Sequence, residues 1–263
     1  MIKKIGIIGL GSIGSRYLRV LSNSFKNIEI LVVRSDPNKP NPDLNYQIKI
    51  LYSIEEAISL GMQAAIIATP SIFHVDQLKK LIVNNIHVLV EKPLSNTLNS
   101  LNNIENINSK IVKLMGYCFR YDPAAIFFKN LIKKLESKKI IHARIESGSY
   151  LPNWRPKQDY RSSCSAKKNL GGGVLLELSH ELDFINWFFE DIDSVYGSYY
   201  NSNSLEIDVE DSADLIFESN NGYNISVHLD FNTFDRRRKC TIFFDKEKLV
   251  WDILKKKVIR YFY

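Results

Sequence analysis

The stretch that decides the fold runs from Ile5 to Gly14 and reads IGIIGLGSIG. A short apolar run precedes three glycines, Gly9, Gly11 and Gly14, at the spacing G-x-G-x-x-G. We expect a strand over residues 5–8, a tight turn at Gly9, close approach of a pyrophosphate at Gly11 and close helix packing at Gly14. The N-terminus of that helix would favour an anion, because its N–H groups are unpaired. The alternative is a strand–helix turn that binds nothing.

The first 115 residues alternate between apolar strands and amphipathic helices. Further strands are expected at residues 28–33, 64–68, 86–90 and 111–115. Helices are expected at residues 53–60, 72–84 and 98–107, the first with Ser53 as N-cap and Glu56 completing a capping box. This alternation of strands and helices predicts an α/β domain over residues 1–120, built on a doubly wound parallel sheet.

Such sheets bind ligands beyond the carboxyl ends of their strands. The candidate cofactor-binding residues lie at or just past those ends: Gly9, Gly11, Ser12, Ile13, Gly14, Arg34, Ser35, Ala68, Thr69, Pro70, His74, Glu91, Lys92 and Arg120.

The position about 20 residues beyond the last glycine discriminates between the two nicotinamide cofactors. An acidic residue there binds the ribose 2′-hydroxyl of NAD, whereas an arginine accommodates the 2′-phosphate of NADP. Arg34 occupies this position and is followed by Ser35. We therefore favour NADP(H); the alternative is an exposed loop arginine, with NAD(H) read by Asp36.

Composition and charge narrow the class of ligand. The chain has 263 residues, of which 45% are hydrophobic and 24% charged, as in an ordinary globular protein. Its net charge of +6 is spread along the sequence, which favours small anions over nucleic acid. Two basic clusters, Arg236–Lys239 and Lys255–Lys257, are expected to be solvated faces or guards of an edge strand. The alternative for Arg236–Arg238 is a contact with substrate phosphates.

Three cysteines, Cys118, Cys164 and Cys240, follow neither a metal-ligand nor a redox spacing, so no metal site is expected. An odd number without a disulfide framework fits a reducing compartment. The two lysines before the first apolar run suggest a signal peptide, but the glycines and the shortness of the run favour a strand. No stretch is long enough to cross a membrane. We expect a cytoplasmic protein.

From residue 121 onward the pattern changes to an α+β domain with a largely antiparallel open sheet. Strands are expected at residues 140–147, 194–200, 211–218, 223–232 and 239–245, with a hairpin turn at 220–222 and helices at 123–137 and 172–189. Exposed aromatic residues are expected on this half, and they permit a homo-oligomer through the sheet: Tyr196, Tyr199, Tyr200, Phe231 and Phe234.

Several blocks resemble the Gfo/Idh/MocA family of NAD(P)-dependent sugar and cyclitol oxidoreductases, which pairs a Rossmann domain with such a second domain. They occur in the family's order: GLGSIG at Gly9–Gly14, ATPSIFH at Ala68–His74, VEKPLS at Val90–Ser95, GYCFRYDPA at Gly116–Ala124 and GGGVLLELSHELD at Gly171–Asp183. The stretch Leu151–Asp183 is also similar to members from bacterial surface-polysaccharide pathways. Relatives usually continue for several tens of residues beyond a point equivalent to Tyr263. Either this is a compact member, or its last strand and helix are missing.

The resemblance implies catalytic residues. The lysine of the family's EKP motif lies near the nicotinamide and the substrate hydroxyl, so Lys92 carries over as the proton-transfer candidate. Glu177, His180 and Asp183 interrupt an apolar segment at helical spacing, which requires polar partners or a ligand. We expect His180 to orient the substrate or assist Lys92, with Glu177 setting its tautomer. The alternative is that His180 hydrogen-bonds within the domain junction.

One position departs from the family pattern. The family's aspartate four residues before this histidine is replaced by Leu176, which puts the equivalence of Glu177 in doubt.

Other residues are candidates for the substrate side of the cleft. They are aromatic or charged and could stack on a sugar or pair with its phosphate: Tyr121, Trp154, Arg155, Tyr160, Arg161 and Asp183. The alternative for the loop members is that they cover the domain junction. We thus expect hydride transfer between a nicotinamide and a sugar or nucleotide-sugar carbon. The rival hypotheses are a non-redox, NAD-assisted elimination or glycoside cleavage, and an inactive nucleotide-binding relative.

Overall fold

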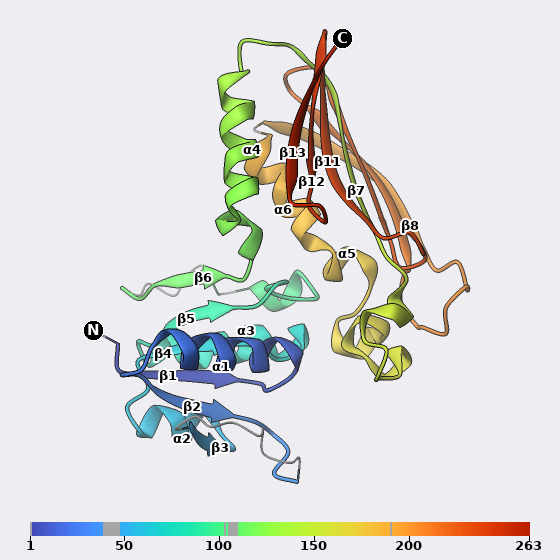
Figure 1. Ribbon diagram of the computed structural model, residues 1–263. Coiled ribbons are helices and arrows are strands. Elements are labelled where there is room, and N and C mark those ends of the chain that lie inside the picture. The colour runs from blue at the N-terminus through green and yellow to red at the C-terminus, as the bar shows by residue number, and fades with distance from the viewer. Residues whose placement is uncertain (1, 39–47, 103, 105–109, 190) are drawn as a thin grey trace. The chain divides into compact units, whose positions relative to one another are not determined.

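The computed structural model describes residues 2–38, 48–102, 104, 110–189 and 191–263. The chain divides into two compact units, Met1–Gly116 and Tyr117–Tyr263, each of them a single continuous stretch. Figure 1 shows both units, coloured from blue at the N-terminus to red at the C-terminus. Each unit is described by itself below.

The first unit contains a six-stranded, entirely parallel sheet with the strand order β3-β2-β1-β4-β5-β6. Its strands are β1 (Lys4–Ile8), β2 (Glu29–Val33), β3 (Ile48–Leu51), β4 (Ala64–Ile67), β5 (His87–Val90) and β6 (Lys113–Met115). The prediction of a doubly wound parallel sheet is therefore confirmed. The sequence did not indicate β3, a four-residue edge strand with only Leu51 buried.

Three helices pack on this sheet: α1 (Ser12–Ser24), α2 (Ile54–Ser59) and α3 (His74–Val83), the last preceded by the 3₁₀ turn η1 (Ser71–Phe73). Ile7 belongs to a core cluster with Leu18 of α1, whereas Ile8 belongs to a second cluster with Leu78 and Leu81 of α3. Both faces of the central strands are thus covered, which explains their uninterrupted apolar sequence.

Two local predictions in this unit need correction. Ser53 caps α2 by accepting the Glu56 N–H, but the Glu56 carboxylate accepts from Tyr52 rather than from Ser53, so the box is incomplete. At the helix predicted over residues 98–107, the structure shows a single 3₁₀ turn, η2 (Asn99–Leu101). Residues 103 and 105–109 of that prediction lie outside the described residues.

The second unit contains a seven-stranded sheet with the order β13-β12-β11-β7-β10-β9-β8. Its strands are β7 (Ile140–Gly148), β8 (Ile192–Tyr200), β9 (Ser212–Ser219), β10 (Asn224–Asp230), β11 (Arg237–Phe244), β12 (Glu247–Asp252) and β13 (Lys257–Phe262). All pairings are antiparallel except β7 with β10, which confirms the largely antiparallel sheet. The last two strands were not predicted, because their lysines and arginine weaken the strand signal.

One face of this sheet is covered by α4 (Pro123–Lys134), α5 (Val174–Glu177) and α6 (Ser179–Phe188), as Figure 1 shows for α4 and α6. The core between them is aromatic, with Phe128, Phe184 and Trp251 almost completely buried. Phe231 is also fully buried, so its prediction as an exposed aromatic residue was wrong. Its ring packs edge-on against Trp154.

The opposite face of the sheet carries polar and aromatic side chains. Tyr196 and Tyr200 of β8 are more than half exposed. A hollow of about 740 Å³ lies over the central strands, lined by residues that include Arg144, Glu146 and His228. Arg237, from the basic cluster considered as an alternative phosphate contact, also lines this hollow.

Candidate functional site

The turn between β1 and α1 is shaped by its glycines. Gly9 has a φ of +91°, and a Cβ atom there would lie 2.8 Å from the Ala68 carbonyl oxygen. A Cβ atom on Gly14 would lie 2.0 Å from the Gly9 carbonyl oxygen, so only glycine lets α1 approach the turn this closely. A Cβ atom on Gly11 would meet nothing within 4 Å. Gly9 and Gly14 are therefore required by the fold, whereas Gly11 leaves space beside the backbone.

This turn fits the pyrophosphate of a dinucleotide. Gly11 is the N-cap of α1 and no side chain caps this end, so the N–H groups of the first turn, including those of Ser12 and Ile13, are available to an anion. The open space at Gly11 lies at the same helix end. The residues present therefore suit a phosphate group held by backbone N–H donors.

Arg34 and Ser35 directly follow β2. The Arg34 residue is buried, its backbone N–H donates to the Leu51 carbonyl, and its guanidinium lies 3.5 Å from the Pro37 carbonyl oxygen. Asp36 accepts a hydrogen bond from the Asn38 N–H and so orders the same loop. The arginine is thus held at the strand end rather than standing in solvent as an exposed loop residue.

The loops after β4 and β5 are joined by His74. Its ring is 1% exposed and lies 2.8 Å from the carbonyl oxygens of both Thr69 and Pro93. The Thr69 hydroxyl in turn donates to Gln77 of α3. His74, predicted as a cofactor contact, therefore fastens the segment containing Pro70 to the one that follows Lys92.

Lys92 comes two residues after the last residue of β5 and is half-buried. The preceding Glu91 carboxylate accepts the Lys92 N–H at 3.2 Å and the Tyr17 hydroxyl of α1 at 2.6 Å. A Cβ atom on Gly116 would lie within 3.0 Å of the same carboxylate, so glycine makes room for it. Neither Tyr17 nor Gly116 was among the predicted site residues.

The strand order brings the predicted residues of this unit together. Because β4 pairs with both β1 and β5, the glycine turn and Lys92 lie at the same edge of the sheet, one strand apart. The ends of β2 and β4, with Arg34 and Thr69, belong to this edge as well.

In the second unit, Arg120 and Asp183 form a bidentate ion pair, with an Nη2–Oδ1 distance of 2.7 Å and an Nε–Oδ2 distance of 2.9 Å. This pairing raises the pKa of Arg120. The guanidinium also lies 5.7 Å from the ring centroid of Trp187. The sequence assigned Arg120 to the cofactor and Asp183 to the substrate, whereas in the structure each charge neutralises the other. Tyr121, which follows Arg120 in the sequence, is 70% exposed.

His180 lies in the first turn of α6 and is 9% exposed. Its ring packs edge-on against Phe119 and Tyr117, with centroid distances of 4.9 and 5.6 Å. Next to it, Glu181 is fully buried and forms a bidentate pair with Arg238 of β11, at 2.6 and 3.0 Å. Arg238 therefore belongs neither to a solvated face nor to an edge strand, and that prediction was wrong. Burial also raises the pKa of Tyr117.

The single helix predicted over residues 172–189 was wrong, because the chain leaves helical geometry at Leu178. Glu177 ends α5, while His180 and Asp183 belong to α6, so the three do not form one helical seam.

Close packing requires glycine at the two positions that precede α5, Gly172 and Gly173. A Cβ atom on Gly172 would lie 2.4 Å from the Cys164 carbonyl oxygen, and one on Gly173, whose φ is +112°, would lie 2.2 Å from Glu210.

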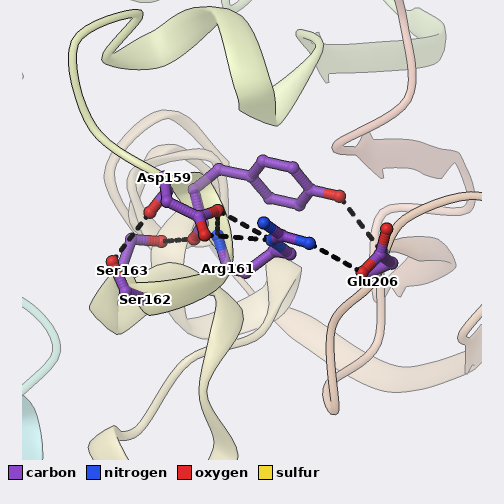
Figure 2. Close-up of polar contacts among 6 residues, drawn as sticks. Asp159, Arg161, Ser162, Ser163 and Glu206 are labelled. Carbon is purple, nitrogen blue, oxygen red and sulfur yellow. Dashed lines mark hydrogen bonds and ion pairs between the residues drawn. The ribbon is translucent and has the colours of Figure 1, made fainter.

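Two of the loop residues proposed for the substrate, Tyr160 and Arg161, contact Glu206, and Figure 2 shows the ion pairs of Arg161. Arg161 pairs with Asp159 at 2.9 Å and with Glu206 at 3.0 Å, and the Tyr160 hydroxyl accepts the Glu206 N–H. The Trp154 indole donates to Ser149. Arg155 is exposed next to this cluster. Arg161 and Tyr160 thus fasten the loop to residue 206 within the second unit.

Among the described residues, no cluster of three or more His, Cys, Asp or Glu side chains could hold a metal ion. Within the same part of the chain, every helix is too short or too polar to cross a membrane.

A parallel sheet with a glycine turn, followed by an α+β unit with an open sheet, defines a two-unit dinucleotide-binding protein of the Rossmann type. The profile described as "Oxidoreductase family, NAD-binding Rossmann fold" (Gfo/Idh/MocA) matches residues 3–114, and the profile of that family's C-terminal domain matches residues 128–250. The chain belongs to the Gfo/Idh/MocA family of NAD-binding oxidoreductases.

Curated relatives and solved structures agree with this assignment. The inositol 2-dehydrogenase of Salmonella typhimurium is 25% identical over 243 residues, which cover 88% of this chain and 68% of that one. The 2,7-anhydro-N-acetylneuraminate hydratase of Escherichia coli is 26% identical over 190 residues, 71% of this chain and 50% of that one. The WlbA dehydrogenase of Bordetella pertussis, solved with NADH and UDP-GlcNAcA, superposes with a TM-score of 0.84 at 17% identity and covers 100% of this chain and 83% of that one. At this level of identity, the similarity to the WlbA dehydrogenase shows a shared fold and nothing more.

Proposed function

We propose that this oxidoreductase transfers a hydride between C4 of a nicotinamide and a ring carbon of a sugar or nucleotide sugar. The observation that carries the proposal is the placement of Lys92 one strand away from the glycine turn, at the same edge of the parallel sheet. When hydride leaves or reaches the carbon that bears the substrate oxygen, a proton must leave or join that oxygen. An amine at this end of the sheet is placed to exchange that proton. The relatives that act on inositol and that bind a UDP-linked sugar support the substrate class.

Different residues of the chain have separate roles in the proposed reaction. The N–H groups at the start of α1 hold the pyrophosphate, and the cofactor supplies the hydride acceptor or donor. Lys92 Nζ exchanges a proton with the reacting substrate oxygen. We further assign to His180 the orientation of the substrate. Glu177 remains a candidate to fix the His180 tautomer, although it lies in a different helix.

For the cofactor, we propose a preference for NADP(H) over NAD(H). Arg34 follows β2 at the position that meets the ribose, and a planar guanidinium is well matched to a 2′-phosphate. The test measures the dissociation constants of NADP(H) and of NAD(H), both for the wild-type protein and for Arg34→Ala. Arg34→Ala should weaken NADP(H) binding about tenfold while changing NAD(H) binding little, since only the phosphate contact is lost. Equal weakening of both cofactors would mean that Arg34 serves only the fold.

We propose that two copies associate through the open face of the seven-stranded sheet. Tyr196 and Tyr200 are more than half exposed there, and Tyr196 lies opposite Ile216 of the neighbouring strand β9. Light scattering during gel filtration should give twice the monomer mass, and Ile216→Glu should return it to that of one chain. We also assign the protein to the cytoplasm, where its cysteines Cys118, Cys164 and Cys240 would stay reduced as thiols.

The experiment that tests the function is a turnover screen. Purified protein is incubated with NAD⁺ or NADP⁺ and with cyclitols, sugar phosphates or UDP-linked sugars, and the absorbance of reduced nicotinamide is followed. An increase that depends on one sugar class supports the proposal. A protein that binds cofactor but transforms none of these sugars contradicts it.

A second candidate function is an NAD-assisted elimination or hydration, which the similarity to the hydratase of Escherichia coli favours. It predicts that sugar is consumed with no net change in nicotinamide absorbance. Product analysis by mass spectrometry in the same screen distinguishes the two functions.

A further inference from the structure

Tyr17 lies on the helix of the glycine turn and contacts the segment that carries Lys92. It comes five residues after the first residue of α1, and its hydroxyl donates to Glu91 Oε1 at 2.6 Å. The two residues are 74 positions apart in the sequence. This hydrogen bond therefore joins the element that holds the pyrophosphate to the strand end that precedes Lys92.

The Glu91 carboxylate accepts two hydrogen bonds and lies beside a glycine. Oε1 accepts from Tyr17, Oε2 accepts the backbone N–H of Lys92 at 3.2 Å, and Gly116 faces the group without a side chain. The Gly116 N–H donates at 2.7 Å to the carbonyl of Val90, directly before Glu91. Because both oxygens have a donor, the carboxylate fixes the backbone at Lys92 relative to α1.

We propose that Tyr17 is a positioning residue for the reaction, acting through Glu91 on the placement of the Lys92 amine relative to the bound cofactor. The inference rests on the proposed function, since it gives Lys92 the proton transfer. Its physical basis is that a small misplacement of a reacting group slows a reaction strongly while leaving remote binding contacts intact.

The first test is kinetic and uses Tyr17→Phe, which removes one hydroxyl from a half-buried ring. We expect kcat to fall about tenfold to a hundredfold, with KM for the sugar within about twofold of wild type. The matched control is Tyr52→Phe, which removes the same atom from a ring that is 52% exposed in the same unit. An unchanged kcat in Tyr17→Phe overturns the proposal, and so does a loss confined to the melting temperature or the cofactor dissociation constant.

The second test perturbs the same carboxylate from its other side. In Gly116→Ala the new methyl group lies within 3.0 Å of the Glu91 carboxylate and displaces it. If Tyr17 acts through Glu91, the losses in Tyr17→Phe and Gly116→Ala are less than additive in the double variant. Strictly additive losses would show that Tyr17 works by another route.

The third test needs no turnover. The intact protein, without sugar, is treated with an amine-acylating reagent over a range of pH, and labelling of Lys92 is quantified by mass spectrometry. Tyr17→Phe should change the labelling profile of Lys92, and Tyr52→Phe should not. If wild-type protein fails to transform any sugar, the proposed function is wrong, yet this profile still decides whether Tyr17 controls Lys92. Identical profiles in all three proteins refute the link.

Discussion

Arg238 of β11 and Glu181 of α6 form a bidentate ion pair in which the carboxylate is fully buried and the guanidinium side chain is 16% exposed. The guanidinium also lies 4.6 Å from the ring centroid of Phe119, the ring that packs edge-on against His180. The pair therefore joins the central sheet of the second unit to the helix turn that carries His180.

Arg238→Leu should destabilise the protein by about 3–5 kcal/mol, because it leaves the Glu181 carboxylate buried without its partner. Urea unfolding measures this directly. Arg237→Leu, at a neighbouring exposed side chain, should cost no more than about 0.5 kcal/mol. Adding Glu181→Leu to Arg238→Leu should recover most of the loss, since no unpaired charge remains. A double variant as unstable as the single one would show that packing of the arginine stem, rather than the charge, is what matters.

Lys92→Met should reduce kcat by about 10²- to 10⁴-fold, the contribution of a positioned proton-transfer group. The dissociation constant for the cofactor should change little, because we propose that the start of α1, and not this amine, holds the pyrophosphate. Lys26→Met, at an exposed loop lysine, serves as the control. Retention of near-wild-type turnover in Lys92→Met would remove this residue from the mechanism.

Gly11→Ala should fold as stably as wild type but lose cofactor binding. The backbone at Gly11 has φ −78° and ψ −162°, which alanine adopts without strain, and the new methyl group meets no protein atom within 4 Å. It would instead fill the space beside the helix N-terminus. We expect the increase in melting temperature that NAD(H) or NADP(H) gives wild type to disappear.

Gly14→Ala is the contrasting case. Its methyl group would lie 2.0 Å from the Gly9 carbonyl oxygen, so the helix must move away from β1. This variant should lose stability even without cofactor. If instead both glycine variants keep the cofactor-induced shift, the turn is not the pyrophosphate site.

The stability of the second unit should depend on pH through His228. Asp230 and Asp214 lie beside its ring and raise its pKa to about 9, above the ordinary 6.5. A raised folded-state pKa means that the native state binds the proton more tightly, so this stabilisation is complete below pH 6.5 and is lost as pH rises through about 9. The difference in unfolding free energy between wild type and His228→Gln should follow that curve. A difference that is constant from pH 6 to pH 10 would contradict it.

The sequence predicted the first unit well because its signals are local. Steric constraints within one strand–turn–helix require Gly9 and Gly14, and the apolar runs of β1 and β2 are buried on both faces of the sheet. Their order along the chain then places Lys92 at the edge where the turn lies. Edge strands such as β3 bury few residues, and their pattern is correspondingly weak.

The contacts of the candidate site could not be predicted, because they join distant positions. Glu181 and Arg238 are 57 residues apart, and Tyr17 and Glu91 are 74 apart, so no spacing rule connects them. The break at Leu178 was hidden because good helix formers lie on both sides of it: Leu175, Leu176 and Glu177 before it, Glu181 and Leu182 after it. Arg161 illustrates a third limit, since an arginine in a loop signals a phosphate ligand and an internal ion pair equally well.

The chain passes from one unit to the other at a single point, between Gly116 and Tyr117. Recombination between relatives would therefore need only one crossover to exchange the half that carries His180 while keeping the half that carries Lys92. The position of that crossover is constrained, because Gly116 must stay with the first half, where it leaves room for the Glu91 carboxylate. A chimaera joined directly after Gly116 would inherit the glycine turn and Lys92 from one parent and His180 from the other.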